Sequence, residues 1–433
     1  MQIRVSARTL MKIGIFVVIY TGFGGTYYFM QNRLQELGFA LLILLFLYTA
    51  VLSALNNHPN SINWSRWFFL TLFLITYMMT VPAFVFAGHF NVPALPSVLA
   101  SREFLAILFA PVLYFSYRSG LTPSEIERVI CFSFGAIILS YLFHYFRIDL
   151  EAAYRSPIAA INGMVTHDDW RGYRLKGPNV ALVFCTLISP LLLYRATIRL
   201  ERLFWMTVFC VTLWSWGVLQ ARSLMAAVFV STFLYHAWFA RPTRLPLFYL
   251  GAPILLTILA FIIYKFVTDL SSIDPVRYRS FSQAVEFLSN NPILGFGKDS
   301  AATLKEQQLM NPWFYSSDIG IVGAAFRIGI FGAIALVVTL IATLTRTIRT
   351  NWLFFRHERT VNVIFLFFII KTTGDLINIF LSAVGYLKIG GILSLGMAIG
   401  LTSIYRHYYC SKKSLYFINN QLGNGCSAPK PVS

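Results

Sequence analysis

Charged residues are scarce in this chain. Asp, Glu, Lys and Arg make up 12% of its 433 residues, whereas 57% are hydrophobic and the mean hydropathy is +0.66. Typical soluble domains contain about 25% charged residues, so this composition excludes an ordinary soluble enzyme. Acidic residues are the rarer kind, at 17 against 35 Lys and Arg. We therefore expect an integral membrane protein. We attribute the excess of Lys and Arg to the segments that orient such a protein in the membrane, and not to nucleic-acid binding.

Clusters of metal-binding and nucleophilic residues are also lacking. The five cysteines fall in apolar runs or near the C-terminus, so no outer disulfide and no metal-ligand spacing is formed. No G-x-x-x-x-G-K-[ST], H-E-x-x-H or G-x-S-x-G motif occurs, which removes support for nucleotide hydrolysis, zinc proteolysis and serine hydrolysis. We expect neither a metal nor a cofactor.

Apolar runs take up most of the chain. A helical span needs about 17–25 apolar residues, and such runs lie near 11–30, 36–55, 67–87, 101–117, 129–146, 179–194, 203–221, 223–240, 246–268, 319–345, 361–385 and 389–405. They predict an all-α polytopic membrane protein, with one transmembrane domain over 1–433 and about twelve spans.

The basic residues predict the orientation. Arg4, Arg8 and Lys12 precede the first run without a cleavage pattern after it, so that run should remain as a span. With both termini in the cytoplasm, four basic residues fall in short outer segments: Arg33, Arg102, Arg222 and Lys388. Both long loops, 147–178 and 269–318, then lie outside and hold ten of the seventeen acidic residues, which predicts a solvated chemical site there.

The second long loop is the longest polar interruption. Asp274-Pro275 is a good N-cap and first-turn pair and Asn291-Pro292 a natural stop, which predicts a short helix between them. Its apolar residues share one face: Tyr278, Phe281, Val285 and Leu288. Arg279 and Glu286 lie roughly opposite. We expect the apolar face to rest on protein or membrane while the charged face meets water.

The first long loop mixes both signs of charge. Its charged residues are Arg147, Asp149, Glu151, Arg155, Asp168, Asp169, Arg171, Arg174 and Lys176. Loops of this length in compact proteins are commonly functional or disordered, and Trp170 and Tyr173 argue against disorder. A solvated connector is the alternative.

Three helix starts that face outward carry polar or cationic groups. Arg174 and Lys176 precede the sixth run, Arg222 the eighth and Asp318 the tenth. Unpaired backbone N–H groups and the helix dipole favour a phosphate there, and Arg adds bidentate geometry. Arg327, further into the tenth run, should reach the same outer cavity. A snorkelling role for Arg222 is the alternative.

Lys371 and Asp375 are the charges placed inside a run, and their i, i+4 spacing puts them on one helix face. Intramembrane charges are candidate functional groups. A self-neutralising structural pair is equally consistent with this spacing.

Four segments resemble one family. Arg279, a helix and then NPILGFG are similar to the R…(N)PxxGxG signature of the O-antigen ligase and polymerase superfamily, and SDIGIVGAAFRIGIFG resembles its following segment. RLKGPNVALVF and QARSLMAAVF resemble the starts of two spans in that family. The resemblance covers roughly Arg171 to Gly332 and rests on the order, spacing and shared outer placement of short motifs.

The resemblance implies a glycosyltransferase of the bacterial inner membrane that takes a glycan from an undecaprenyl-diphosphate carrier at the periplasmic face, as in lipopolysaccharide biosynthesis. The diphosphate would be held by outer-loop cations: Arg279, Arg277, Arg222, Arg171, Arg174, Lys176 and Arg327. Asp318, then Asp168 and Asp169, are candidates for the base that deprotonates the acceptor hydroxyl. The lipid-linked oligosaccharide, membrane lipids and a chain-length regulator are the expected partners.

One position separates the branches of this family. Eleven residues before Gly329, ligases that attach glycan to lipid A core typically carry a His, whereas this chain has Asp318. We therefore favour a polymerase that joins repeat units. A ligase, a lipid-linked oligosaccharide flippase and a non-catalytic receptor stay open, although a flippase should show repeats and more mid-membrane polar residues than Lys371 and Asp375.

Overall fold

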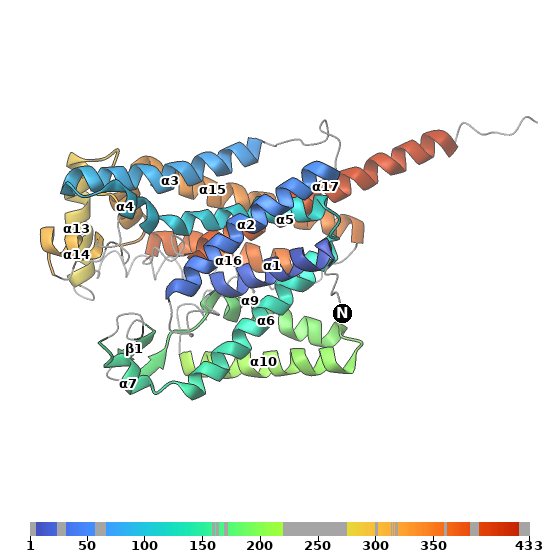
Figure 1. Cartoon of the computed structure of the whole chain (residues 1–433), viewed down its shortest axis with the longest axis horizontal. Helices are drawn as coiled ribbons and strands as arrows, with labels where there is room; N and C mark the ends of the chain where they lie inside the picture. The colour runs from blue at the N-terminus through green and yellow to red at the C-terminus, as the bar shows by residue number, and fades with distance from the viewer. Residues whose placement is uncertain are drawn as a thin grey trace, which may run out of the picture.

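In the computed structural model the chain forms a bundle of helices that run back and forth along one axis (Figure 1). The structure describes residues 6–23, 32–56, 66–157, 161, 164–168, 172–219, 275–298, 302–312, 314, 316, 319–358, 362–381 and 389–423. Up to the middle of the chain the elements are α1 (Ala7–Gly22), α2 (Asn32–Asn56), α3 (Arg66–Phe90), α4 (Ala94–Ala100), the 3-10 helix η3 (Arg102–Leu108), α5 (Phe109–Arg118), α6 (Pro123–Arg147), α7 (Leu150–Tyr154), β1 (Val165–Asp168) and β2 (Gly172–Leu175). The remaining elements are α9 (Asn179–Arg195), α10 (Arg199–Leu219), α13 (Pro275–Asn290), α14 (Ala302–Leu309), α15 (Gly320–Glu358), α16 (Val363–Leu381) and α17 (Ile389–Gly423).

Among the described residues, five helices are long and apolar enough to cross a membrane, namely α2, α3, α6, α10 and α15. The segment from α4 to α5 is bent by 48° and would make a sixth span, whereas α9 is a shorter apolar helix. The predicted helical membrane protein is thus confirmed within the described residues. The number twelve stays a prediction, and the runs 223–240 and 246–268 lie outside the described residues.

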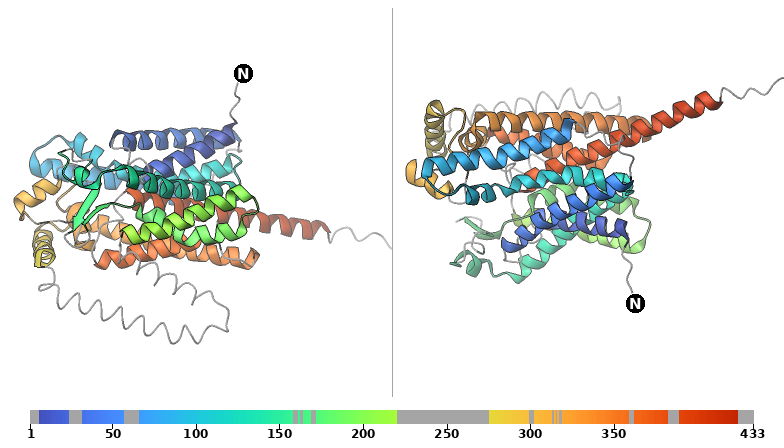
Figure 2. Two further views of the ribbon diagram at one scale, coloured as in Figure 1. Left: turned by 90° about the horizontal axis from the view of Figure 1, so that it is seen from below. Right: turned by 45° about the horizontal axis from the view of Figure 1, so that its top comes forward.

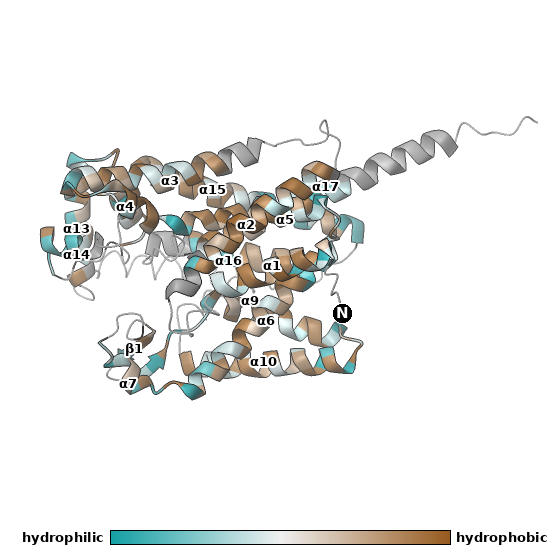
Figure 3. Cartoon of the chain, in the orientation of Figure 1, coloured by the Kyte–Doolittle hydropathy of each residue, from teal (hydrophilic) through white to brown (hydrophobic). Residues whose placement is uncertain are grey.

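The bundle has two different ends. At one end, here called the loop end, lie α13, α14, α7 and the two strands (Figure 1). At the other, here called the terminal end, lie the start of α1 and the second half of α17, and the same arrangement is seen in both views of Figure 2. Figure 3 shows hydrophilic residues gathered at the loop end on α13 and α14. Both long loops therefore share one end of the bundle.

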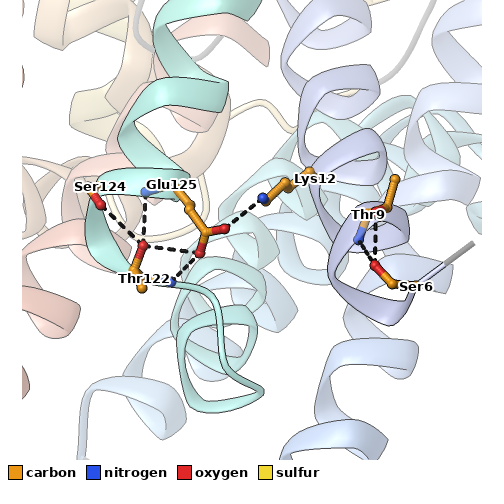
Figure 4. A network of polar contacts seen from close by, with 6 residues as sticks. All are labelled: Ser6, Thr9, Lys12, Thr122, Ser124 and Glu125. Carbon is orange, nitrogen blue, oxygen red and sulfur yellow. Dashed lines mark hydrogen bonds and ion pairs between the residues drawn. The ribbon is translucent and has the colours of Figure 1, made fainter.

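Polar caps fix the terminal end. Thr122 accepts a hydrogen bond from the Glu125 amide while the Glu125 carboxylate accepts from the Thr122 amide, a capping box that starts α6 (Figure 4). Lys12 on α1 donates to the same carboxylate at 2.6 Å. One side chain thus caps α6 and joins it to α1, which sets how these two helices meet.

The turn after α13, residues 291–298, is called the docking turn because it packs between α3 and α15. Gly295 and Gly297 have φ values of +69° and +94°, where glycine is favoured. A Cβ on Gly297 would lie 2.5 Å from the Phe86 amide nitrogen of α3, and one on Gly295 would lie 2.6 Å from the Phe326 carbonyl of α15. Only glycine allows this approach to both helices.

Helix α15 is broken at Gly329, whose φ of 74° and ψ of 165° are not helical. In a continuous helix the Ile330 amide would donate to the Phe326 carbonyl. Here Ile330 N donates to Pro292 O at 3.1 Å, and Phe326 O accepts from Phe296 N at 2.6 Å. The docking turn therefore satisfies both backbone groups that the break releases.

A small aromatic core, separate from the main core of the bundle, holds the docking turn in place. Its buried members are Phe86, Ala284, Phe296, Phe314, Ile319 and Phe326. The Phe296 ring stacks on the Phe326 ring with centroids 4.9 Å apart and planes 17° apart. Because these residues come from α3, α13, the docking turn, the segment between α14 and α15, and α15 itself, their burial ties the loop end together.

Substitution of Gly329 tests the docking of the turn. A Cβ at this position would lie 2.1 Å from Ile293 O, at a positive φ, so we expect Gly329→Ala to lower stability by at least about 1–3 kcal/mol. Gly88→Ala is the matched control, since Gly88 lies in α3 with nothing within 4 Å of its added Cβ. The melting temperature of purified protein should fall for Gly329→Ala alone; equal melting of both variants contradicts the docking.

Candidate functional site

Helix α13 lies across the loop end and has three faces. Its bounds, Pro275–Asn290, confirm the predicted short helix. The face on α15 carries Ser280 and Ala284, which are almost fully buried. On the predicted apolar face Tyr278 and Phe281 are 49% and 40% exposed, whereas Leu288 packs against the main core, so a contact of this face with the membrane stays a prediction. Small side chains make the close contact with α15, and the large side chains of Tyr278 and Phe281 remain exposed.

The charged face of α13 is exposed as predicted. Arg279 and Glu286 both point away from the buried face, and the Glu286 carbonyl ties the helix end by accepting from Ser289 and Asn290. Arg279 makes no ion pair with another described residue. Its guanidinium is therefore available to an anion.

A buried ion pair fixes α14 on α15. Arg327 Nε and Nη2 donate to the two carboxylate oxygens of Glu306 at 2.9 and 3.2 Å, a fork-on-fork geometry. Ser316 Oγ donates to Glu306 Oε2 at 2.9 Å. Glu306 has no exposed surface and Arg327 is 20% exposed. Arg327 thus has a carboxylate for a partner, which competes with the predicted role on a diphosphate.

Lys298 forms the other charged junction at this end. Its amide donates to the Pro82 carbonyl of α3, and its ammonium lies 3.5 Å from Glu103 on η3 and 5.1 Å from the centre of the Phe104 ring. Burial lowers the pKa of Lys298; the Glu103 carboxylate opposes this shift, and the guanidinium of Arg327 adds to it. The lysine and Arg327 are therefore neighbours in one cationic region.

Within the first long loop the structure has the short helix α7 and a β-hairpin, and this hairpin departs from the predicted all-α fold. Strands β1 and β2 pair in antiparallel register, with Val165 opposite Leu175 and Asp168 opposite Gly172. Val165 and Leu175, which lie opposite each other in the hairpin, are buried, whereas His167 further along β1 is exposed. Tyr154 of α7 packs on His167. The hairpin lies beside α6 and α10, on a different side of the loop end from α13 (Figure 1).

Two predicted diphosphate ligands lie on the hairpin strand and its exit. Arg174 Nη1 donates to the Leu219 carbonyl at 3.0 Å, where it caps the end of α10. Lys176 is exposed, and its amide donates to the Met164 carbonyl. Arg174 therefore has a structural role that its sequence position did not reveal.

The remaining predicted site residues are described only in part. Asp168 and Arg277 have a described backbone, in β1 and α13, but no described side chain. Four others lie outside the described residues: Asp169, Arg171, Arg222 and Asp318. Ser316 and Ile319, on either side of Asp318, lie beside Glu306 and in the aromatic core.

The predicted pair in α16 is present. Lys371 Nζ lies 2.5 Å from Asp375 Oδ1, and both side chains are 15% exposed. The two charges neutralise each other on one helix face, which fits the structural alternative.

Sequence patterns missed Glu306 and Lys298. Glu306 sits in α14 without periodicity that marks a buried position, and its arginine is 21 residues away. The available signal for Lys298 was its place directly after the NPILGFG motif.

Removal of Arg327 should leave Glu306 buried without a cation. We expect Arg327→Met to lower stability by about 3–5 kcal/mol, and the double variant Arg327→Met/Glu306→Met to regain most of that loss. The melting temperatures of the purified proteins in one detergent measure both. A single variant as stable as the parent would show that Glu306 does not depend on Arg327.

No family model matches the chain, and no curated protein matches it either.

Proposed function

We propose that this protein is a glycosyltransferase that polymerises undecaprenyl-diphosphate-linked repeat units of a bacterial surface polysaccharide at the periplasmic face of the inner membrane. One observation carries the proposal. The two segments with the strongest resemblance to O-antigen ligases and polymerases, NPILGFG and GAAFRIGIFG, interlock through the break in α15. If each motif resembled the family only by chance, the two segments would not be expected to contact each other in the fold.

The charge around these segments supports a diphosphate donor. Arg279 is exposed on α13, and Lys298 on the turn and Arg327 on α15 are near enough to each other to interact electrostatically. Arg327 and Lys298 have carboxylate partners, so they position the helices. Arg279, with its planar fork open to water, is the residue that we assign to the diphosphate.

The chemistry requires two groups. The acceptor hydroxyl attacks the anomeric carbon of the donor sugar, its proton goes to a carboxylate, and the bond from that carbon to the diphosphate oxygen breaks. Arg279 stabilises the charge that develops on the leaving diphosphate. We assign the base to Asp318, with Asp168 and Asp169 as alternatives. Its neighbours Ser316 and Ile319 are held at the start of α15, on the element that also carries Arg327.

The membrane-facing part of the donor fits the apolar face of α13. Tyr278, Phe281 and Val285 are exposed at the end of a bundle whose spans meet lipid, on the side of α13 roughly opposite Arg279. A carrier whose diphosphate lies at Arg279 would keep its polyprenyl chain on the lipid side of the same helix.

Deletion of the gene tests the proposed function. The surface polysaccharide of the deletion strain, separated on a gel, should collapse to single repeat units on lipid A core. Reintroduction of the parent gene should restore long chains. Loss of all glycan from lipid A core would instead indicate a ligase, and unchanged chain length would contradict both.

Arg279→Lys tests the diphosphate assignment. Lysine keeps the charge but loses the bidentate fork, so we expect chain formation by membranes of the complemented strain to fall on the order of tenfold or more at normal expression. Arg199→Lys, an exposed arginine at the terminal end, is the control and should behave as the parent. Full activity of Arg279→Lys would reduce Arg279 to a generic surface charge.

A further inference from the structure

A cavity of about 250 Å³ opens at the terminal end of the bundle, away from the proposed catalytic site. It lies where α6, α10 and α16 begin and α9 ends, and these helices pack on one another (Figure 2). This volume is close to the lower end of the roughly 300–1,000 Å³ typical of small-molecule sites. With both termini in the cytoplasm, the cavity faces the inner leaflet and the cytoplasm.

Four charged side chains line the cavity without neutralising one another. They are Glu127 and Arg128 on α6, Arg195 on α9 and Glu201 on α10. Within the part of the chain that the structure describes, no two of them come within ion-pair distance, and Arg128, Arg195 and Glu201 make no hydrogen bond. Arg195 is near enough to Glu127 to interact with it electrostatically. The cavity thus offers two cations and two anions.

Two polar side chains of the wall, Glu127 and Trp205, have a hydrogen-bonding atom without a partner among the described residues. Glu127 Oε1 accepts from Asn362 Nδ2 at 2.6 Å and from Tyr405 OH at 2.7 Å, which fixes the carboxylate in place. Its Oε2 accepts from none of the described residues. Trp205, 1% exposed, lines the same cavity, and its Nε1 has no acceptor among the described groups. The Trp205 donor is therefore left without a partner at a buried position, where this is costly, and Glu127 Oε2 can accept from a further donor.

The inner part of the cavity is apolar. Phe132, Ile188 and Ile364 line it; Phe132 on α6 and Ile188 on α9 are two turns or less from the charged residues of those helices. A ligand that suits this wall has a charged head with both signs and a less polar remainder. A simple anion would leave the two carboxylates unpaired, and a simple cation would leave the two guanidinium groups unpaired.

We propose that this cavity binds a phosphoethanolamine group, with its phosphate on Arg128 and Arg195 and its ammonium on Glu127 Oε2 and Glu201. The guanidinium groups suit phosphate oxygens, and Trp205 Nε1 adds a donor. An ammonium supplies three donors to the two carboxylates. The same chemistry comes either from a phosphatidylethanolamine headgroup of the inner leaflet or from a soluble phosphoethanolamine, and basic clefts between spans at the cytoplasmic side are suited to lipid headgroups. The site does not depend on the proposed catalytic function.

Calorimetric titration of delipidated full-length protein in a maltoside detergent tests the site. The probes are dihexanoyl-phosphatidylethanolamine, O-phosphorylethanolamine, dihexanoyl-phosphatidylcholine and inorganic phosphate. We expect at least one of the two ethanolamine compounds to bind more tightly than the choline lipid, whose quaternary nitrogen has no N–H donor, and more tightly than phosphate. Tighter binding of the lipid than of O-phosphorylethanolamine assigns the source to the membrane, and equal binding assigns it to the cytosol.

Three variants separate this site from general surface charge. Arg195→Gln should weaken binding of the preferred ethanolamine compound by about tenfold or more, because a charge-assisted contact is lost. Glu201→Gln should weaken it as well, without weakening the binding of inorganic phosphate. Arg199→Gln, at the first residue of α10 and outside the cavity lining, should change nothing. Phosphate or the choline lipid binding as tightly as both ethanolamine compounds, or Arg195→Gln and Arg199→Gln behaving alike, overturns the proposal.

Discussion

The break in α15 is the constraint on which the loop end depends. A helix that crosses a membrane cannot leave backbone groups unpaired, because lipid offers no hydrogen bonds in exchange. At Gly329 the chain leaves helical geometry, so the helical hydrogen bond from Ile330 N to Phe326 O does not form. Pro292 and Phe296 of the docking turn supply the replacements. The broken helix and the turn therefore require each other.

The positions of the charged groups follow from this docking. Arg327 is one residue beyond Phe326 and two before Gly329, so the same contact that seats the turn also aims its guanidinium at α14. Lys298 is the last residue of the turn and is held against α3 by its own amide. Helix α13 leads directly into the turn, which fixes where Arg279 stands. The backbone hydrogen bonds between the docking turn and α15 thus place Arg279, Lys298 and Arg327 at one end of the bundle.

Local signals in the sequence were sufficient for some of this arrangement. The Pro275 and Asn291 signals fixed the bounds of α13, and the i, i+4 spacing fixed the Lys371–Asp375 pair, since both depend on neighbours within one helix. The sequence shows the motif that begins at Asn291, but it does not show that this motif packs against the break in α15. Pairing a turn with a helix break about thirty residues later depends on tertiary packing, which no local pattern encodes.

The errors have the same origin. Periodicity identified the apolar face of α13 correctly, yet Ser280 and Ala284 make the protein contact because their small side chains let α13 approach α15 closely. The hairpin at Val165–Leu175 was missed because each strand is only four residues long. Arg174 was read as a ligand because its cap on Leu219 joins residues 45 positions apart.

The ion pairs of the loop end explain why one arginine remains for a substrate. A buried guanidinium without a carboxylate would cost several kcal/mol, so Arg327 is stable at its depth only with Glu306 beside it. Once paired, it contributes little net charge but holds α14 and α15 in a fixed relation. Arg279 is exposed and bears no such cost, so it does not need an internal partner to be stable. Among the described side chains of α13, the Arg279 guanidinium therefore stays open to solvent, which is why the proposed diphosphate contact is assigned to it.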